Sequence, residues 1–332
     1  MQKRVFLLRF SSLGDVVLTS SLIDPLVGAG FKPVLLTYAP YGELFKEDSR
    51  LSVVEVRRDS LRGLRPILDL SKELSKLSPF AVLDLHSNPK SVLLSRLIPA
   101  GVKVGYRKRS LRRRVCVFLN RFGLAEGLKE KPLNVVELYA ETLKGLGIDV
   151  KSPRPRIVLD GNRTGEILSK FDLKGDEYVV LGIGARYRSK AYPHFERLAK
   201  ILSEEGIRVV LVGDRRDYDL SRDWKGVLNL CGKLSLNESL HVMRGAKLFV
   251  GNDSGATHMA RAVGTKVLAI YGGTHPCLGF APYPDEGEVL FKGLPCSPCH
   301  IHGRDSCPRD FECLDIPPEV VAEKVFSLLG RD

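Results

Sequence analysis

The chain has 332 residues, enough for two ordinary domains that each bury a core. Its hydrophobic content of 44% excludes a disordered or fibrous protein, and no run approaches the roughly 20 apolar residues of a membrane span. The 51 Lys and Arg exceed the 39 Asp and Glu, and this net charge of +12 predicts an anionic partner: a nucleic acid, an acidic membrane face or a phosphorylated substrate.

The first residues, MQKRVFLLRFSSLGD, combine a basic start with an apolar segment of about six residues. That segment is shorter than the core of a signal peptide, and no small-residue cleavage site follows it. We therefore expect a first β-strand here and a cytoplasmic protein.

Short apolar runs alternate with amphipathic segments through the first half. Strands are expected over Val5–Phe10, Pro33–Tyr38, Ser52–Val56, Phe80–Leu85 and Val102–Tyr106, and helices over Asp15–Val27, Ile67–Leu77 and Lys90–Leu97. This alternation predicts a parallel sheet with helices on both faces.

The alternation restarts after a basic, proline-containing stretch, Lys151–Gly161, which suits a linker. Strands are expected over Glu177–Gly184, Ile207–Gly213, Ala246–Asn252 and Lys266–Gly272, and helices over Phe195–Glu204, Leu236–Met243, Thr257–Val263 and Glu319–Leu329. The chain thus divides into two similar α/β halves, residues 1–155 and 156–332. Ligands bind at the carboxyl ends of such strands, so we expect the site in a cleft between the halves.

Two segments of the second half predict an anion site. Gly184 and Arg186 follow a strand, and Lys190 precedes an expected helix opening at residues 190–193. Small residues admit a ligand to the backbone, while cations and a helix N-terminus attract a diphosphate. The alternative is an ordinary solvated basic turn.

The second segment is GNDSGATHMARAVG, Gly251–Gly264. Asp253, Ser254 and Gly255 turn the chain into a helix, and His258 lies in its first turn, where it can reach the same anion. The alternative is a plain capped turn with a surface histidine.

The segment FSSLGDVVLTS, Phe10–Ser20, follows the first strand but lacks the Gly-Lys-Ser/Thr ending of a phosphate loop and the three spaced glycines of a dinucleotide site. It offers Gly14 for close approach and Asp15 at a helix start. Asp15 is either a helix-capping carboxylate or a general base that takes a proton from an acceptor hydroxyl.

These segments together resemble the ADP-heptose:lipopolysaccharide heptosyltransferases, glycosyltransferase family nine. The resemblance rests on Ser11–Thr19, Leu83–Ser91, the segment from Gly184 through Lys190 to Pro193, Asn229–Leu236, Asp253–His258 and Ala269–Pro276. It covers nearly the whole chain.

The resemblance implies a GT-B fold, with two Rossmann-like domains facing across a cleft, the acceptor in the first and the nucleotide sugar in the second. It implies an inverting, metal-independent transfer without a cofactor, in which Asp15 is the base, Lys190 neutralises the leaving diphosphate and Asp253 lies toward the sugar. The residues expected to bind the donor are Gly184, Arg186, Lys190, Gly232, Asp253, Ser254, Gly255 and His258; those expected to bind the acceptor are Ser12, Gly14, Arg62, Lys90, Arg107, Arg112 and Arg113.

The expected partners are a nucleotide-sugar donor such as ADP-heptose, a phosphorylated Kdo-bearing glycolipid and the anionic cytoplasmic face of the inner membrane. The closing helix is expected either to stay with the second domain or to pack back on the first. Alternatives are transfer of another sugar, a sugar-nucleotide epimerase, and a nucleic-acid-binding protein that uses the Arg107–Arg114 cluster. No groove-reading motif or set of stacking aromatics accompanies those arginines, which argues against the last.

Four of the seven cysteines, Cys296, Cys299, Cys307 and Cys313, crowd into one loop after the last expected strand. They could hold a structural metal, form two disulfides or stay free thiols, and the spacing leaves all three open.

Overall fold

The structure is a computed structural model that describes residues 2–331. The chain forms two compact units. The first comprises residues up to Lys108 together with Val135–Leu159, and the second comprises Arg109–Asn134 and the chain from Asp160 onward. The expected boundary at residues 155/156 lies close to the last of these crossings, but the excursion of Arg109–Asn134 into the second unit was not foreseen.

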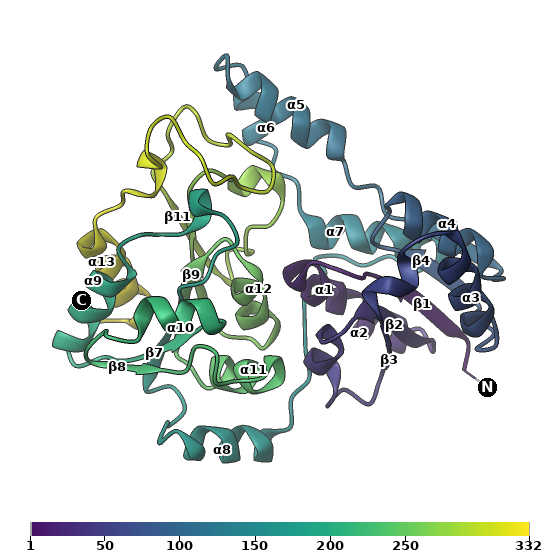
Figure 1. Ribbon diagram of the computed structural model, residues 1–332, viewed down its shortest axis with the longest axis horizontal. Coiled ribbons are helices and arrows are strands. Elements are labelled where there is room, and N and C mark those ends of the chain that lie inside the picture. The colour runs from purple at the N-terminus through teal and green to yellow at the C-terminus, as the bar shows by residue number, and fades with distance from the viewer. Residues whose placement is uncertain (1, 332) are drawn as a thin grey trace. The chain divides into compact units, whose positions relative to one another are not determined.

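The first unit is built on a five-stranded parallel sheet of order β3-β2-β1-β4-β5. Its strands are β1 (Arg4–Leu8), β2 (Lys32–Tyr38), β3 (Ser52–Val56), β4 (Ala81–Asp84) and β5 (Val102–Gly105). Its α-helices are α1 (Leu13–Leu18), α2 (Ile23–Gly28), α3 (Leu64–Ser75), α4 (Pro89–Leu97) and α7 (Val135–Ala140) (Figure 1). The strand order reverses between β1 and β4, which is where ligands bind in sheets of this kind.

Strand β1 lies at the centre of this sheet, and its residues Val5–Leu8 are fully buried. Helices cover both faces of a central parallel strand, which explains the continuous apolar run in the sequence. On one face, Phe6 and Leu8 belong to a cluster with Ile67 of α3 and Leu94 of α4.

The helix expected over Asp15–Val27 is interrupted. α1 ends at Leu18, a 3-10 helix spans Thr19–Leu22, and α2 begins at Ile23. The hydroxyls of Thr19, Ser20 and Ser21 each donate to the carbonyl three residues earlier, at 2.6–2.8 Å. Such side-chain bonds compete with the α-helical pattern and tighten the turn.

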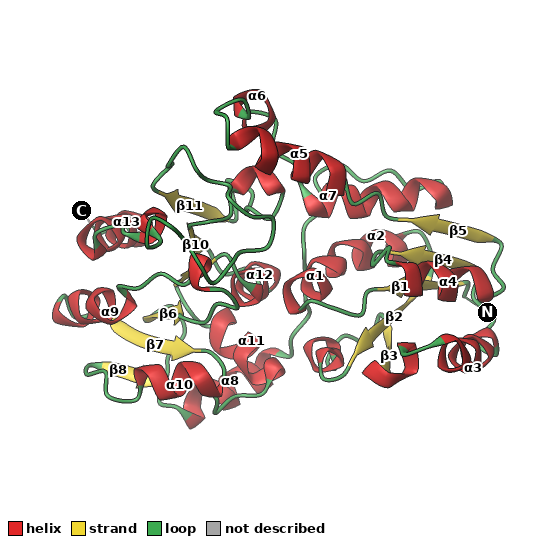
Figure 2. Ribbon diagram, turned by 45° about the horizontal axis from the view of Figure 1, so that its top comes forward, coloured by secondary structure: helices red, strands yellow, loops and turns green. Residues whose placement is uncertain are grey.

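The second unit is built on a six-stranded parallel sheet of order β11-β10-β9-β6-β7-β8. Its strands are β6 (Tyr178–Gly182), β7 (Arg208–Val212), β8 (Val227–Asn229), β9 (Leu248–Asn252), β10 (Val267–Tyr271) and β11 (Gly287–Phe291). Its helices are α5 (Ser110–Asn120), α6 (Glu126–Lys129), α8 (Gly161–Lys170), α9 (Phe195–Glu204), α10 (Arg215–Ser221), α11 (Leu236–Arg244), α12 (Gly255–Ala262) and α13 (Pro318–Leu329) (Figure 2). Its order reverses between β6 and β9.

The closing helix α13 packs within the second unit. Its Val321 and Val325 join the cluster that contains Leu198 and Leu202 of α9.

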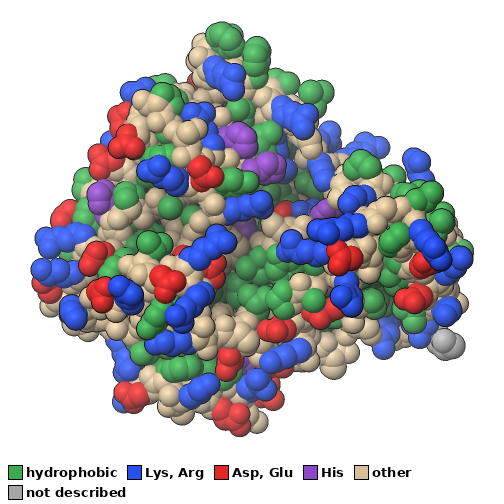
Figure 3. All heavy atoms as spheres, viewed as in Figure 1, with side chains coloured by type: hydrophobic (Ala, Val, Ile, Leu, Met, Phe, Trp, Pro, Cys, Tyr) green, Lys and Arg blue, Asp and Glu red, His purple; other side chains and the backbone are tan. Residues whose placement is uncertain are grey.

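Among residues 2–331, no helix has the length and apolar character needed to cross a bilayer. Lys and Arg side chains are spread over the face shown in Figure 3, with Asp and Glu side chains among them.

Candidate functional site

Asp15 lies in the first turn of α1, just past the carboxyl end of β1. Its Oδ2 accepts the Ser12 hydroxyl at 2.8 Å and lies 2.6 Å from Nη2 of Arg9. Its Oδ1 lies 3.4 Å from the hydroxyl of Tyr139. The carboxylate is therefore held in place and remains 18% exposed, so a substrate hydroxyl could reach it.

Arg9 is the buried partner of this carboxylate. Its Nη1 donates to the carbonyl of Leu85 at 2.7 Å, and its side chain is only 9% exposed. Burial lowers the pKa of Arg9, but the groups that face it, Tyr139 and Asp15 foremost, raise the pKa by more than burial lowers it. The net shift of the pKa is therefore upward. The guanidinium therefore stays charged beside the Asp15 carboxylate.

Two further titratable side chains, Tyr139 and His86, lie close to Arg9 and Asp15. Burial raises the pKa of Tyr139 well above 10.0, so its hydroxyl stays protonated and available as a donor. At the end of β4, burial, and then the charges of Arg9 and Lys108, lower the pKa of His86 to about 4. His86 is thus neutral at pH 7, and its buried Nδ1 has no hydrogen-bond partner within the part of the chain that the structure describes.

The residues predicted to bind the acceptor are divided between the units. Ser12, Gly14, Arg62, Lys90 and Arg107 lie in the first unit, and Arg112 and Arg113 lie on α5 in the second. Arg62 is 76% exposed, and Lys90 is exposed in the first turn of α4. Arg112 donates to the carbonyl of Lys131. Arg113, by contrast, is buried, and its guanidinium lies over the ring of Phe280, while its Nε and Nη2 have no hydrogen-bond partner among the described residues.

In the second unit, the loops after the neighbouring strands β6, β9 and β10 meet. Lys190 follows β6, Asp253 follows β9, and Thr274 follows β10. Nζ of Lys190 lies 2.8 Å from Oδ2 of Asp253, and the Thr274 hydroxyl donates to the same oxygen at 2.8 Å. The expected helix opening at Lys190 is wrong: Lys190 ends a short 3-10 turn, Arg188–Lys190, and α9 begins at Phe195.

The pKa of Asp253 shows how this cluster is balanced. Burial alone would raise the pKa, but Lys190, Thr274 and His258 outweigh burial and lower it below 3.8. The carboxylate is therefore ionised at neutral pH, and the lysine that it binds is held at the strand ends.

The N-terminus of α12 is adjacent to Asp253. Ser254 occupies the capping position without making a capping bond, and its buried hydroxyl has no hydrogen-bond partner among residues 2–331. His258 is buried in the same helix, with its Nδ1 3.2 Å from Nη1 of Arg261. Arg261 is in turn paired with Glu286 at 2.6 Å. The backbone N–H groups in the first turn of α12 and the Ser254 hydroxyl suit an oxyanion.

The remaining predicted donor residues have other surroundings. A Cβ at Gly184 would lie 2.5 Å from Oδ2 of Asp217, so a larger residue there would require the Asp217 carboxylate to shift. Gly232 has φ +65° and lies against Arg215. A Cβ at position 232 would lie 3.1 Å from Cα of Arg215. Arg186 is exposed and lies over the ring of Tyr187.

A family model described as glycosyltransferase family 9 (heptosyltransferase) matches residues 67–305. The chain belongs to glycosyltransferase family 9. The match covers about half of the first unit, beginning after Asp15, and most of the second unit, including the loops that carry Lys190, Asp253 and Thr274.

Relatives in family 9 support this membership. Lipooligosaccharide heptosyltransferase 2 of Haemophilus influenzae is 27% identical over 201 residues, which cover 55% of this chain and 58% of the relative. The matched region spans about half the length of the first curated relatives.

Two solved structures share the fold. Heptosyltransferase II of Escherichia coli matches with a TM-score of 0.74 at 19% identity, over 100% of this chain and 99% of the other. Heptosyltransferase WaaC of the same organism, solved with ADP-2-deoxy-2-fluoro heptose, matches with a TM-score of 0.68 at 20% identity, over 98% and 99%. The fold of this family 9 member is GT-B, as expected.

The cysteine loop lies directly against the Lys190 segment. The backbone N–H of Ser189 donates to Arg304, the N–H of Arg304 donates to the Ser189 hydroxyl, and the N–H of Gly273 donates to the carbonyl of Ser189. Gly303, with φ +101°, would place a Cβ 3.0 Å from Cδ of Lys190. The loop thus supports the segment that holds the lysine, which the sequence did not indicate.

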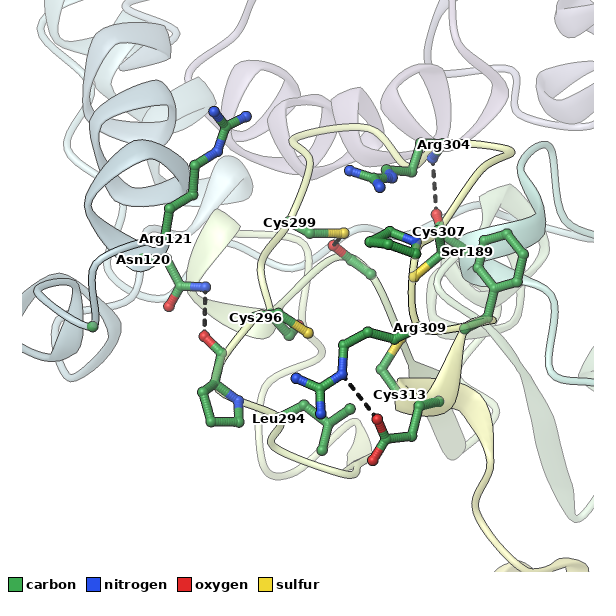
Figure 4. A pocket seen from close by; sticks show the side chains of 17 residues that line it. Asn120, Arg121, Ser189, Leu294, Cys296, Cys299, Arg304, Cys307, Arg309 and Cys313 are labelled. Atoms are coloured by element: carbon green, nitrogen blue, oxygen red, sulfur yellow. Dashed lines mark hydrogen bonds and ion pairs between the residues drawn. The ribbon is translucent and has the colours of Figure 1, made fainter.

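The same loop encloses a cavity of about 470 Å³. Figure 4 shows the side chains of Cys296, Cys299, Cys307 and Cys313 around it. All four are free thiols, so the disulfide alternative is wrong for this structure. Within residues 2–331, no three His, Cys, Asp or Glu side chains are arranged to hold a metal ion.

Proposed function

We propose that this chain is an inverting, metal-independent glycosyltransferase that moves heptose from ADP-heptose to the Kdo/heptose inner core of lipopolysaccharide. The observation that carries the proposal is the pair of charged clusters, Arg9–Asp15 and Lys190–Asp253–Thr274, each at the point where the strand order of its sheet reverses. Family 9 relatives are heptosyltransferases, and WaaC was solved with an ADP-heptose analogue.

In the proposed reaction, Asp15 accepts the proton of the acceptor hydroxyl. The oxygen of that hydroxyl attacks the anomeric carbon, the bond from that carbon to the phosphate oxygen breaks, and ADP leaves with the electron pair. Lys190 and the N–H groups at the start of α12 bind the diphosphate, whose negative charge grows as the bond breaks. The paired Asp253 positions Lys190 and accepts hydrogen bonds from the sugar.

The buried guanidinium of Arg113 supports an anionic substrate. Two of its nitrogens are buried without a partner, an arrangement that is costly unless a ligand satisfies it. We assign these nitrogens to an anionic group of the acceptor. Because that acceptor is a glycolipid, the enzyme associates peripherally with the anionic cytoplasmic face of the inner membrane.

The test is transfer from ADP-heptose to a heptose-free, Kdo-bearing lipopolysaccharide, followed by mass spectrometry. Asp15→Asn should lower kcat by about 10²–10⁴-fold, the usual contribution of a general base. Its affinity for ADP, measured by calorimetry, should equal that of the wild type. Turnover of Asp15→Asn near the wild-type rate would show that Asp15 is not the base.

A panel of nucleotide sugars in thermal-shift measurements separates the alternatives. A donor that binds the native state raises the melting temperature. The proposal expects the largest shift with ADP-heptose. A larger shift with another nucleotide sugar would support another transfer, and turnover without any acceptor would support an epimerase.

A further inference from the structure

The outward face of α5 and of the turn after it is apolar. Leu111, Val115 and Phe118 follow one another at spacings of four and three residues, which places them on one side of α5, and Phe122 in the turn after α5 contacts Phe118. They are 76%, 38%, 56% and 64% exposed, and Leu124 beyond them is 68% exposed. Five large apolar side chains in fourteen residues therefore face solvent together.

The opposite face of α5 is fixed to the second unit. Sγ of Cys116 lies 3.8 Å from Sγ of Cys277, and the amide of Asn120 donates to the carbonyl of Pro295 at 2.9 Å. Figures 1 and 2 show α5 and α6 together at the edge of the ribbon. Because these contacts fix the orientation of α5, a rotation of the helix about its axis cannot bury the apolar stripe.

Positive charge surrounds the stripe. Arg109, Arg114 and Arg121 are exposed on the same segment, and no acidic residue occurs between Leu85 and Ala125. In Figure 3, hydrophobic and Lys or Arg side chains gather at the top, where Figure 1 places α5 and α6. A helix with an apolar stripe, flanking arginines and no acidic residue matches the pattern of segments that lie in a membrane interface.

We propose that the segment Arg109–Leu124 docks this chain on an anionic lipid bilayer, with Phe118 and Phe122 inserted below the headgroups. Their rings touch edge to face with centroids 5.4 Å apart, so they form one continuous apolar contact. The three exposed arginines bind anionic headgroups, and each strengthens binding by about fivefold. The proposal deepens the proposed function, because it assigns the membrane contact that a glycolipid acceptor requires to particular residues.

The experiment is co-sedimentation of the full chain, without donor or acceptor, with vesicles of phosphatidylethanolamine and phosphatidylglycerol. Wild type should bind these vesicles and should bind pure phosphatidylcholine vesicles much more weakly. Phe118→Ser/Phe122→Ser should lower the partition coefficient at least tenfold. Arg114→Gln/Arg121→Gln should lower it by about 25-fold at low salt, and by less as the salt concentration rises.

Leu64→Ser and Leu220→Ser are the matched controls, because these leucines are 61% and 74% exposed elsewhere and their loss should leave binding unchanged. Circular dichroism checks that each variant is folded. The proposal fails if wild type does not bind phosphatidylglycerol vesicles, or if the phenylalanine variant binds them as wild type does. It also fails if the stripe instead mediates a dimer in sedimentation velocity that the phenylalanine variant abolishes.

Transfer to a delipidated, water-soluble acceptor separates this proposal from the proposed function. The phenylalanine variant should keep wild-type kcat with that acceptor and lose rate only with acceptor presented in vesicles. If wild type shows no transfer to either acceptor, the proposed function fails, while the binding result stands by itself.

Discussion

Removing the positive charge from the Lys190–Asp253 pair tests the electrostatics of the second unit. Lys190 and Asp253 are 16% and 8% exposed, and Lys190→Met would leave the carboxylate with Thr274 and His258. Loss of one partner from a buried ion pair costs about 3–5 kcal/mol. We expect a loss of about 3 kcal/mol, the lower end of this range, because Asp253 keeps Thr274 and His258 as partners. For a unit of this size, that corresponds to a fall in melting temperature of roughly 6–12 °C.

Calorimetry at two pH values distinguishes this electrostatic effect from a loss of packing. In the wild type, the lowered pKa of Asp253 means that its stabilisation is present above 3.8 and is lost as the pH falls through the native pKa. In Lys190→Met, burial is no longer offset by the lysine, so the pKa rises. The deficit should then be full at pH 7.5 and smaller at pH 5, where the carboxyl takes up a proton.

The matched control is Lys190→Met/Asp253→Asn, which removes both charges and should recover most of the lost melting temperature. A single variant as stable as wild type would refute the reasoning. So would a double variant no more stable than the single one, or a deficit that grows toward pH 5.

Three further predictions concern groups that the sequence did not single out or placed differently. Arg9→Met should lower kcat at least tenfold, because Asp15 loses the partner that holds it, while the affinity for ADP measured by calorimetry should not change. Arg9→Lys should restore part of the rate. Equal kcat values in the wild type and both variants would contradict this prediction. Gly303→Val should weaken ADP binding several-fold, since its Cβ would press on the Lys190 side chain from a backbone conformation that favours glycine; unchanged affinity would show that the loop does not position the lysine. Arg113→Met should raise the melting temperature, because two buried nitrogens without a hydrogen-bond partner are removed, and should raise KM for the acceptor. A lower melting temperature would mean that the contact of the guanidinium with the Phe280 ring outweighs the cost of these nitrogens.

The central strands and several helices were predictable from the sequence, because their environment is reflected in their composition. Ser52–Val56 and Phe195–Glu204 have the bounds that were expected. The strands β8 and β11 were missed. They lie at the two edges of the second sheet and are only partly buried, so neither has the continuous apolar run of a central strand.

The candidate site was only partly predictable. The motifs identified Asp15, Lys190 and Asp253 singly, but the ion pair of the last two joins residues 63 positions apart and depends on β6 lying beside β9. Arg9 carried a usable signal, a charged residue at the end of an apolar run, because such a residue needs a buried partner. The support that Arg304 gives to Ser189 had no such signal, since it depends on the path of a loop without regular structure.

The chain passes between its two units three times, at residues 108/109, 134/135 and 159/160. A single cut therefore cannot yield two complete halves. A fragment that starts at Asp160 would lack Cys116 and Ala125, leaving Cys277 and Leu278 without half of their apolar cluster. Recombination that exchanges the second unit between relatives must carry the 26 residues from Arg109 to Asn134 along with it. A hybrid made by one crossover would otherwise combine α5 from one parent with the residues it packs against, Cys277 and Leu278, from the other.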